Sequence, residues 1–193
     1  MAGCSNSLLV LDPSCETIKK KGGFDKTFFI GSIADLDAVT ITATGEVTAF
    51  TFAATKGFKK ITGKRLKHGA TVALEVGDII SDRLQNFNSV LYADSAAERF
   101  SVEALADSVD VFVVAESNSG SIEVFGIAND GDGKFNNYGL SPSAGEWNYG
   151  VEINEGGSTI TMAFSGKLPN AALIFNEADT TVANLAVLDA LVV

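Results

Sequence analysis

Short runs in which apolar and polar residues alternate recur along most of this chain, and they constrain its fold more than any other feature. In Val39–Ala43 the apolar side chains fall on one face and the threonines on the other, and Glu46–Phe52 places Phe50 and Phe52 together. A period of two is that of a β-strand with one buried face. Since only the tight turn Thr44–Gly45 separates the two runs, they predict a β-hairpin.

Further hairpins are expected in the second half of the chain. Val109–Glu116 is apolar at consecutive positions and predicts a strand buried on both faces, which Asn118–Gly120 turns into a returning strand over Ser121–Ile127. Trp147–Asn154 and Ser158–Phe164 predict a third hairpin. The remaining strand candidates are Leu8–Leu11, Thr27–Ile30 and Thr71–Val76.

One segment differs from the rest in composition and in the spacing of its apolar residues, and it predicts a helix in the middle of the chain. Ser95–Ala106 is rich in helix formers, and an apolar stripe with helical spacing is formed by Ala97, Phe100, Ala104 and Leu105. Ser95 and Glu98 fit a capping box, with Asp94 as the rival cap. The predicted fold class is therefore mainly β, a β-sandwich or barrel-like fold with one mid-chain α-helix.

Two other segments have no clear period. Asp82–Asp94 is ambiguous between strand and loop, and Ala128–Gly145 predicts a long loop rich in glycine and asparagine. We divide the chain into an N-terminal arm (1–25), a β-rich domain (26–180) and an apolar C-terminal tail (181–193). Such a tail would be a liability unless it packed on its own core or on a neighbour, and we expect deletion of Leu185–Val193 to prevent polymerisation.

Composition excludes several classes of function. The 193 residues carry a net charge of −10, which argues against wrapping nucleic acid by bulk attraction, and no run approaches a membrane span. The only histidine is His68, and the only cysteines are Cys4 and Cys15, so no four-ligand zinc site can form within one chain. The N-terminus has no secretory signal, and we interpret the two cysteines as free thiols in an arm.

Two apparent ligand-binding motifs fail on their spacing. Gly57–Arg65 has five residues between its glycines where a phosphate-binding loop needs four, and it ends on an arginine where that loop needs Ser or Thr. Asp130–Asn137 begins like a calcium loop, but Lys134 and Phe135 stand where a ligand and a glycine are needed. We therefore expect no catalytic residues, no cofactor and no metal.

Charge is segregated along the chain. Residues 1–68 hold ten lysines and arginines against six acids, a balance of +4, whereas residues 69–193 hold four against 18, a balance of −14. Solvated faces of opposite sign explain this, but so does head-to-tail assembly between copies, and a nucleic-acid site is a third explanation. The candidate inter-subunit residues, expected on a protruding loop or hairpin, are Lys56, Lys59, Lys60, Lys64, Arg65 and Lys67.

The order of elements resembles that of the tail tube proteins of tailed bacteriophages. The stretch most similar to that family runs from Ala96–Ala106 into Val109–Val114, and it continues through Ile122–Gly126, Trp147–Val151 and Ser158–Met162. The resemblance covers most of the chain. In that family the helix packs beside a β-sandwich, and the hairpin after it belongs to the sheet.

The resemblance implies a non-enzymatic virion subunit with a tail-tube-like fold. Six copies would form a ring with sheets joined edge to edge, and rings would stack head to tail, with other tail proteins, into a tube assembled in the host cytoplasm. DNA would pass through an acidic lumen during ejection without specific binding, and no membrane would be involved.

Two alternatives of other classes stay open. One is a capsid-associated or head–tail joining structural protein. The other is a carbohydrate- or ligand-binding β-sandwich that would use Trp147, Tyr149 and Tyr138 as stacking surfaces, against the plainer interpretation that these aromatics pack in a core or an interface.

Overall fold

The computed structural model describes residues 23–64, 67–76, 81–92, 95–129, 138–148 and 158–193, and predicted features outside these ranges are not described further. The strands are β1 (Phe24–Ser32), β2 (Leu36–Ile41), β3 (Glu46–Phe52), β4 (Lys59–Thr62), β5 (Gly69–Val76), β6 (Ser81–Tyr92), β7 (Val111–Ser117), β8 (Ile122–Phe125), β9 (Ser141–Asn148), β10 (Thr159–Leu168) and β11 (Leu173–Phe175). The helices are α1 (Ala96–Ala106) and α2 (Thr181–Ala190), with a 3-10 turn at Ile33–Asp35.

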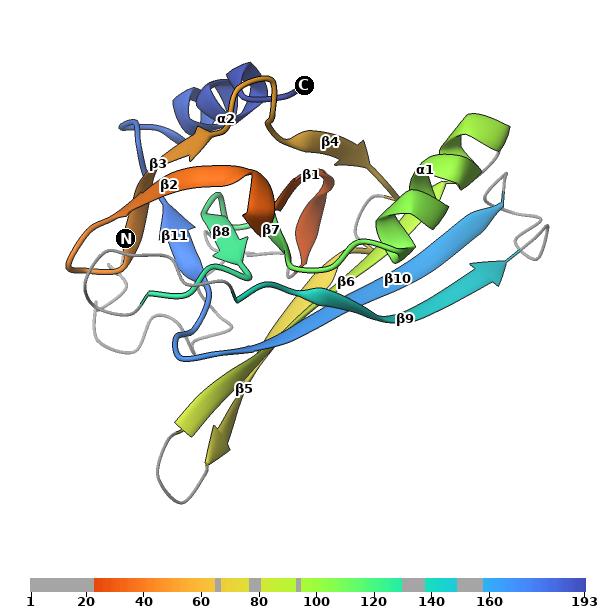
Figure 1. Ribbon diagram of the computed structural model, residues 1–193, viewed down its shortest axis with the longest axis horizontal. Coiled ribbons are helices and arrows are strands. Elements are labelled where there is room, and N and C mark those ends of the chain that lie inside the picture. Colours follow the sequence, from red (N-terminus) through yellow and green to blue (C-terminus); the bar gives the residue numbers. More distant parts are fainter. Residues whose placement is uncertain (1–22, 65–66, 77–80, 93–94, 130–137, 149–157) are drawn as a thin grey trace, which may run out of the picture.

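These strands form two sheets that pack face to face (Figure 1). The larger sheet has seven strands in the order β2-β3-β11-β8-β7-β1-β4, and the smaller has four in the order β5-β6-β10-β9. All pairs are antiparallel except β11 with β3. The fold is therefore mainly β, as predicted.

A first hydrophobic core, core 1, lies between the two sheets. Ring contacts in this core join the two sheets. The ring centroid of Phe87, in the small sheet, lies 5.2 Å from that of Phe28 and 5.8 Å from that of Phe125, both in the large sheet. Val111, Val113 and Ala115 also belong to core 1, while the alternate residues of β7 face the other way, which confirms a strand buried on both faces.

The helix α1 closes one side of core 1. The capping box is present, because the Ser95 hydroxyl accepts from Glu98 N–H at 3.2 Å and the Glu98 carboxylate accepts from Ser95 N–H at 2.9 Å. The predicted stripe is wrong in its position, since α1 buries Val102 and Leu105 and leaves Phe100 72% exposed. The cause is that α1 lies at the margin of the sandwich, so a narrow strip of it meets the core.

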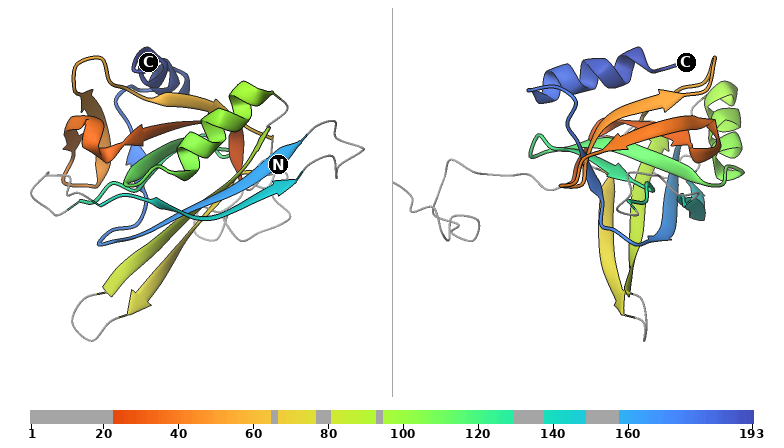
Figure 2. Two further views of the ribbon diagram at one scale, coloured as in Figure 1. Left: turned by 45° about the vertical axis from the view of Figure 1, so that its right-hand side comes forward. Right: turned by 60° about the vertical axis from the view of Figure 1, so that its left-hand side comes forward.

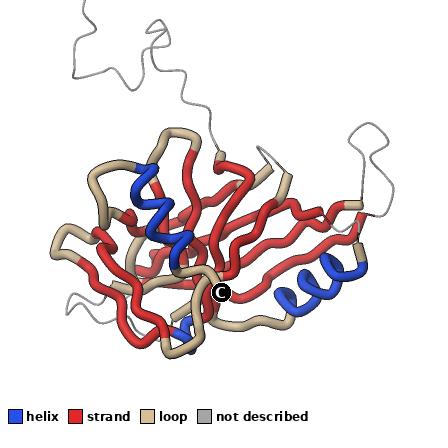
Figure 3. The backbone as a smooth tube through the Cα atoms, turned by 90° about the horizontal axis from the view of Figure 1, so that it is seen from above, coloured by secondary structure: helices blue, strands red, loops and turns tan. Residues whose placement is uncertain are grey.

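A second core, core 2, lies on the other face of the large sheet, under α2 (Figure 2). Leu188 of α2 is fully buried there, and Phe58 N–H donates to the carbonyl of Leu191 at 2.9 Å. The expected C-terminal tail is thus a second helix, capped at Thr180 and packed on its own domain. Seen from above, the two helices lie apart on the molecule (Figure 3).

The predicted hairpins are confirmed where the structure describes them. β2 pairs with β3 across a turn in which Gly45 has φ +84°, and β7 pairs with β8. β9 pairs with β10, although the residues joining them lie outside the described ranges.

Three segment boundaries differ from the prediction. The ambiguous segment Asp82–Asp94 largely forms β6, and the loop expected up to Gly145 already contains the first half of β9. Phe24, assigned to the arm, starts β1 and is buried in core 1. Residues 1–22 lie outside the described chain.

Candidate functional site

The β5–β6 hairpin extends away from the body of the molecule, on the side opposite α2 (Figure 2). The two strands pair from Gly69 opposite Asn88 to Val76 opposite Ser81. β10 accompanies β6 only as far as Leu168, which lies opposite Arg83. Toward its turn the hairpin is therefore a two-stranded ribbon.

One face of β5 is apolar and largely uncovered, whereas the residues opposite its uncovered part on β6 are polar, with Arg83 opposite Leu74. Ala70 lies opposite Phe87 and packs against core 1, so the alternate residues Val72, Leu74 and Val76 share the face that is buried at the base. The exposed fractions of these three residues rise toward the tip, from 40% through 58% to 78%. We call these three side chains the apolar row. Exposed aliphatic side chains that lie together are a candidate interaction surface.

A buried glutamine fixes the hairpin to the body where the apolar row begins. Gln85 lies opposite Val72 and is itself fully buried. Its side-chain oxygen accepts from the N–H of Gly126 at 2.9 Å, and its Nε2 donates to the carbonyl of Asn170 at 2.9 Å. Gly126 directly follows β8 and Asn170 shortly precedes β11, so Gln85 ties the small sheet to the large one.

The outer face of the small sheet points away from core 1 and is mostly small and polar. Its described residues include Thr71, Asn86, Asn88, Thr161, Ala163 and Ser165. Its charged residues are Glu75, Asp82, Glu146 and Lys167, and Lys167 forms an ion pair with Glu75 at 2.6 Å. Within the described part of this face, no lysine or arginine lacks a carboxylate partner, so a polyanion finds no free cation there.

The small sheet also has two outer strands that lack a strand partner on one side within the described chain. These are β5 and β9, each eight residues long. β9 contains Pro142, which has no N–H for a strand ladder and therefore suits an edge strand. Unpaired strand edges are sites at which a second chain can add a strand.

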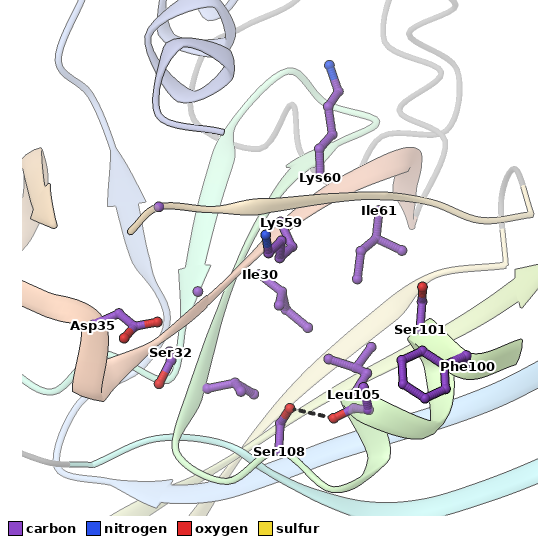
Figure 4. A pocket seen from close by; sticks show the side chains of 14 residues that line it. Ile30, Ser32, Asp35, Lys59, Lys60, Ile61, Phe100, Ser101, Leu105 and Ser108 are labelled. Atoms are coloured by element: carbon purple, nitrogen blue, oxygen red, sulfur yellow. Dashed lines mark hydrogen bonds between the residues drawn. The ribbon is translucent and has the colours of Figure 1, made fainter. Parts of the chain in front are cut away.

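A groove of about 480 Å³ lies between α1 and the β1–β4 end of the large sheet (Figure 4). We call it the α1–β4 groove. Ile30, Ile61 and Leu105 give it an apolar lining, and the exposed Phe100 stands on its α1 side. Part of the stripe predicted to be buried on α1 therefore borders an open groove. Lys59 lies opposite Ile30 in the β1–β4 register, on the groove side of the sheet.

The six basic residues predicted as an inter-subunit site do not form one protruding element. Lys59–Thr62 is strand β4, paired with β1, so the expectation of a protruding loop or hairpin is wrong there. The reason is the pairing with β1, in which Ile61 packs against core 1 while Lys59 and Lys60 stay exposed on opposite sides of the strand. Lys64 is buried at 8% exposure, Lys67 is exposed, and Arg65 lies outside the described residues.

Two of these lysines already have acidic partners in the same chain. Lys56 pairs with Asp35 at 3.1 Å, and Lys60 pairs with Asp189 of α2 at 2.6 Å. Lys59 instead donates to the main-chain oxygen of Val193 at 3.1 Å. An intermolecular role for the basic stretch stays a prediction.

The aromatic residues of the alternative ligand site are only partly placed. Trp147 packs against core 1 at partial exposure, which fits the interpretation of core packing. Tyr138 is 47% exposed, and Tyr149 lies outside the described residues. Of the three side chains, therefore, only Tyr138 is placed at the surface as a stacking platform would require.

His68 lies buried where the chain crosses from β4 to β5. It is 3% exposed, its ring centroid lies 5.3 Å from that of Phe28, and neither ring nitrogen makes a hydrogen bond within the described chain. Burial lowers the pKa of His68 below its usual 6.5, and the smaller effects of the Lys26 main chain and the Asp25 charge oppose that shift. The imidazole is thus neutral in the folded protein at pH 7.

This burial predicts a pH-dependent loss of stability. The unfolded chain takes up a proton at His68 near pH 6.5, and the folded chain only at a lower pH, so unfolding is favoured as pH falls below about 6.5. We expect denaturation midpoints to fall from about pH 7.5 to pH 5.5 more steeply in the wild type than in His68→Phe. Parallel pH profiles of the two proteins would contradict this. Carboxylates such as Glu116, the pKa of which is raised by burial, are present in both proteins, so their effect on stability cancels in the comparison.

Within the described part of the chain, no group of three or more histidine, cysteine and acidic side chains is arranged to hold a metal ion. No described helix is long and apolar enough to cross a membrane.

The chain was compared with protein families, with curated proteins and with solved structures. None of them matches. The features of the molecule that bear on its function are therefore its surfaces, namely the apolar row, the polar sheet face, the two free strand edges and the α1–β4 groove.

Proposed function

We propose that this protein is a non-enzymatic structural subunit of a bacteriophage virion. It assembles into rings, hexameric as the resemblance implies, and these stack head to tail with other tail proteins into a tail tube for DNA passage. The observation that carries the proposal is the small sheet, which combines two free edges with a polar face lacking a free cation among its described residues.

Ring closure would remove both free edges of the small sheet. If β5 of one copy lies beside β9 of the next, the two eight-residue strands continue one sheet around the ring. Closing a sheet upon itself satisfies the unpaired main-chain groups that would otherwise recruit chains at random. The number of copies then follows from the angle between neighbours, which a single chain does not fix.

In such a ring the polar face of the small sheet would line the lumen. Its threonines, asparagines and serines offer hydrogen bonds without charge, and its acids repel phosphate groups. Because non-specific affinity for DNA comes mainly from lysine and arginine contacts with phosphates, a lining without free cations lets DNA pass without holding it. This matches the net charge of −10.

Negative-stain electron microscopy of the purified full chain tests the assembly. We expect hollow tubes with a regular axial repeat once the protein is concentrated. Single rings or flat lattices would instead support a head–tail joining or capsid-associated protein. Monomers at every concentration would contradict self-assembly, and specific binding on a glycan array would then favour the ligand-binding β-sandwich.

A pair of lumen variants tests DNA passage separately. Asn88→Lys with Ser165→Lys adds two cations to the predicted lining, and Asn88→Asp with Ser165→Asp is the matched control. In tubes of equal length, we expect only the lysine variant to retain duplex DNA at about 150 mM salt. If wild-type tubes retain DNA equally well, the lining is not the one proposed.

A further inference from the structure

A buried histidine precedes the first residue of β5, and its ring has no hydrogen-bond partner within the described chain. His68 is 3% exposed, and both of its ring nitrogens lack a described partner. The hydroxyl of Ser89, fully buried in β6, is in the same situation. Burying polar atoms without partners costs free energy. The interior is therefore less stable around His68 than in the purely apolar parts of core 1.

The neutral ring of His68 is held by shape and by one main-chain bond. Its centroid lies 5.3 Å from that of Phe28, and a β-carbon added at Gly63 would meet the Cε1 of the ring at 2.5 Å. The main-chain oxygen of His68 accepts from the N–H of Phe24 at 3.3 Å, which ties the start of β5 to β1. The Lys26 carbonyl, which also acts on the ring, already accepts from Gly63 N–H at 2.7 Å.

The charged groups around the ring compensate a proton on it only in part. On β1 the Asp25 carboxylate attracts an imidazolium, but burial lowers the pKa of His68 more than this attraction raises it. The residue that β6 contributes, Ser89, does not ionise. The described cations close to His68 in the chain or through the main chain would repel an imidazolium, and they are Lys26, Lys64 and Lys67.

We propose that His68 is a pH-sensitive switch for the start of β5. While its imidazole is neutral, the ring closes this part of core 1. Once protonated, the ring turns out to water, breaks the bond to Phe24 and frees the end of the strand. Because β5 is an outer strand of the small sheet, the switch acts on an edge that another chain can join. The switch does not require that the protein forms tubes.

The opening is local, because it involves little of the remaining fold. Core 2 lies on the other face of the large sheet, and Gln85 holds β6 further along through its bonds to Gly126 and Asn170. Parts of a fold with few satisfied contacts open below the free energy of global unfolding. With a pKa of about 6.5 for the exposed imidazole, the open population rises by as much as about tenfold from about pH 7.5 to about pH 5.5.

Amide hydrogen exchange of the full chain at these two pH values, corrected for the intrinsic rate at each, tests the switch. We expect the protection of Phe24 N–H to fall up to about tenfold in the wild type and by less than about twofold in His68→Gln. His68→Phe, which keeps an aromatic ring, should behave like His68→Gln. Well below the unfolding midpoint, exchange at Phe24 should depend less on denaturant than exchange at Val114 in core 2, because a local opening exposes little surface.

A matched pair of glycine substitutions tests the position of the ring. Gly63→Ala places a β-carbon 2.4 Å from the Val90 oxygen and 2.5 Å from the His68 ring. It should therefore displace the ring and lower the protection of Phe24 N–H about tenfold already at about pH 7.5. Gly69→Ala is the control, because its β-carbon meets no described atom within 4 Å apart from its chain neighbours. It should leave that protection within about twofold.

Each outcome decides for or against the switch. A pH-dependent loss of protection at Phe24 that requires His68 and depends weakly on denaturant supports it. Equal pH responses of the wild type and His68→Gln overturn it, and so does exchange at Phe24 that rises with denaturant as steeply as exchange at Val114. If Gly63→Ala and Gly69→Ala protect Phe24 N–H equally, the ring does not close the interior as described, and the switch is also overturned.

Discussion

Deletion of Leu185–Val193 is expected to abolish cooperative folding of the monomer as well as its assembly. The segment covers core 2, where Leu188 is fully buried and Leu185, Val187, Leu191 and Val192 pack at partial exposure. Truncating one fully buried leucine to alanine costs about 2–5 kcal/mol, and a domain has only about 5–15 kcal/mol in total. Loss of all of these side chains at once therefore exhausts the stability.

Thermal unfolding followed by circular dichroism measures this effect. We expect the deletion variant to show no sharp transition and to aggregate, and Leu188→Ala to unfold cooperatively at a lower temperature. Val182→Ser is the control, since that side chain is 78% exposed on the same helix. A deletion variant that melts like the wild type but fails to polymerise would show that α2 serves assembly alone.

Phe87→Ala should destabilise the protein by about 3–5 kcal/mol, the usual cost of removing a fully buried phenylalanine. Phe87 is completely buried, and its ring centroid lies within 6 Å of those of Phe24, Phe28 and Phe125. Those contacts hold the small sheet on the large one, so the cavity opens at the junction that also supports the hairpin.

Denaturant titration of Phe87→Ala against Phe100→Ala checks that expectation. Phe100 is 72% exposed, so its removal should change the free energy of unfolding by less than about 0.5 kcal/mol. The same substitution thus compares a fully buried phenylalanine with an exposed one. Equal destabilisation by the two substitutions would mean that α1 packs more deeply than described.

Secondary structure that depends on residues close together in the sequence was predicted correctly. The hairpin of β2 and β3 follows from alternation and a glycine turn, and the start of α1 follows from the reciprocal bonds of Ser95 and Glu98. The second helix was missed because Val182–Val193 is apolar on most sides, which hides the helical period. The signal that could have revealed this helix is its N-cap residue, Thr180, whose hydroxyl accepts a hydrogen bond from the N–H of Ala183.

The candidate surfaces could not be predicted, because they depend on where a strand or helix ends relative to its neighbours. Val72, Leu74 and Val76 alternate like a buried strand, and only the position of the large sheet leaves them exposed. Phe100 fits a core-facing stripe for the same reason. The basic stretch was misplaced because Lys59 and Lys60 lie between Phe58 and Ile61, which pack against the two cores and hold the segment in the sheet.

The place of β11 in the large sheet has a consequence for the timing of folding. Leu173–Phe175 lies between β3 and β8, so the middle of that sheet waits for residues near the end of the chain. A ribosome adds about 5–20 residues per second, so during synthesis β3 waits about 6–24 seconds and β8 about 2–10 seconds for their shared neighbour. Contacts this distant in sequence also form slowly. A nascent chain therefore cannot complete this sheet until Leu173–Phe175 has been made, which delays the finished sheet well beyond the synthesis of β3 and β8.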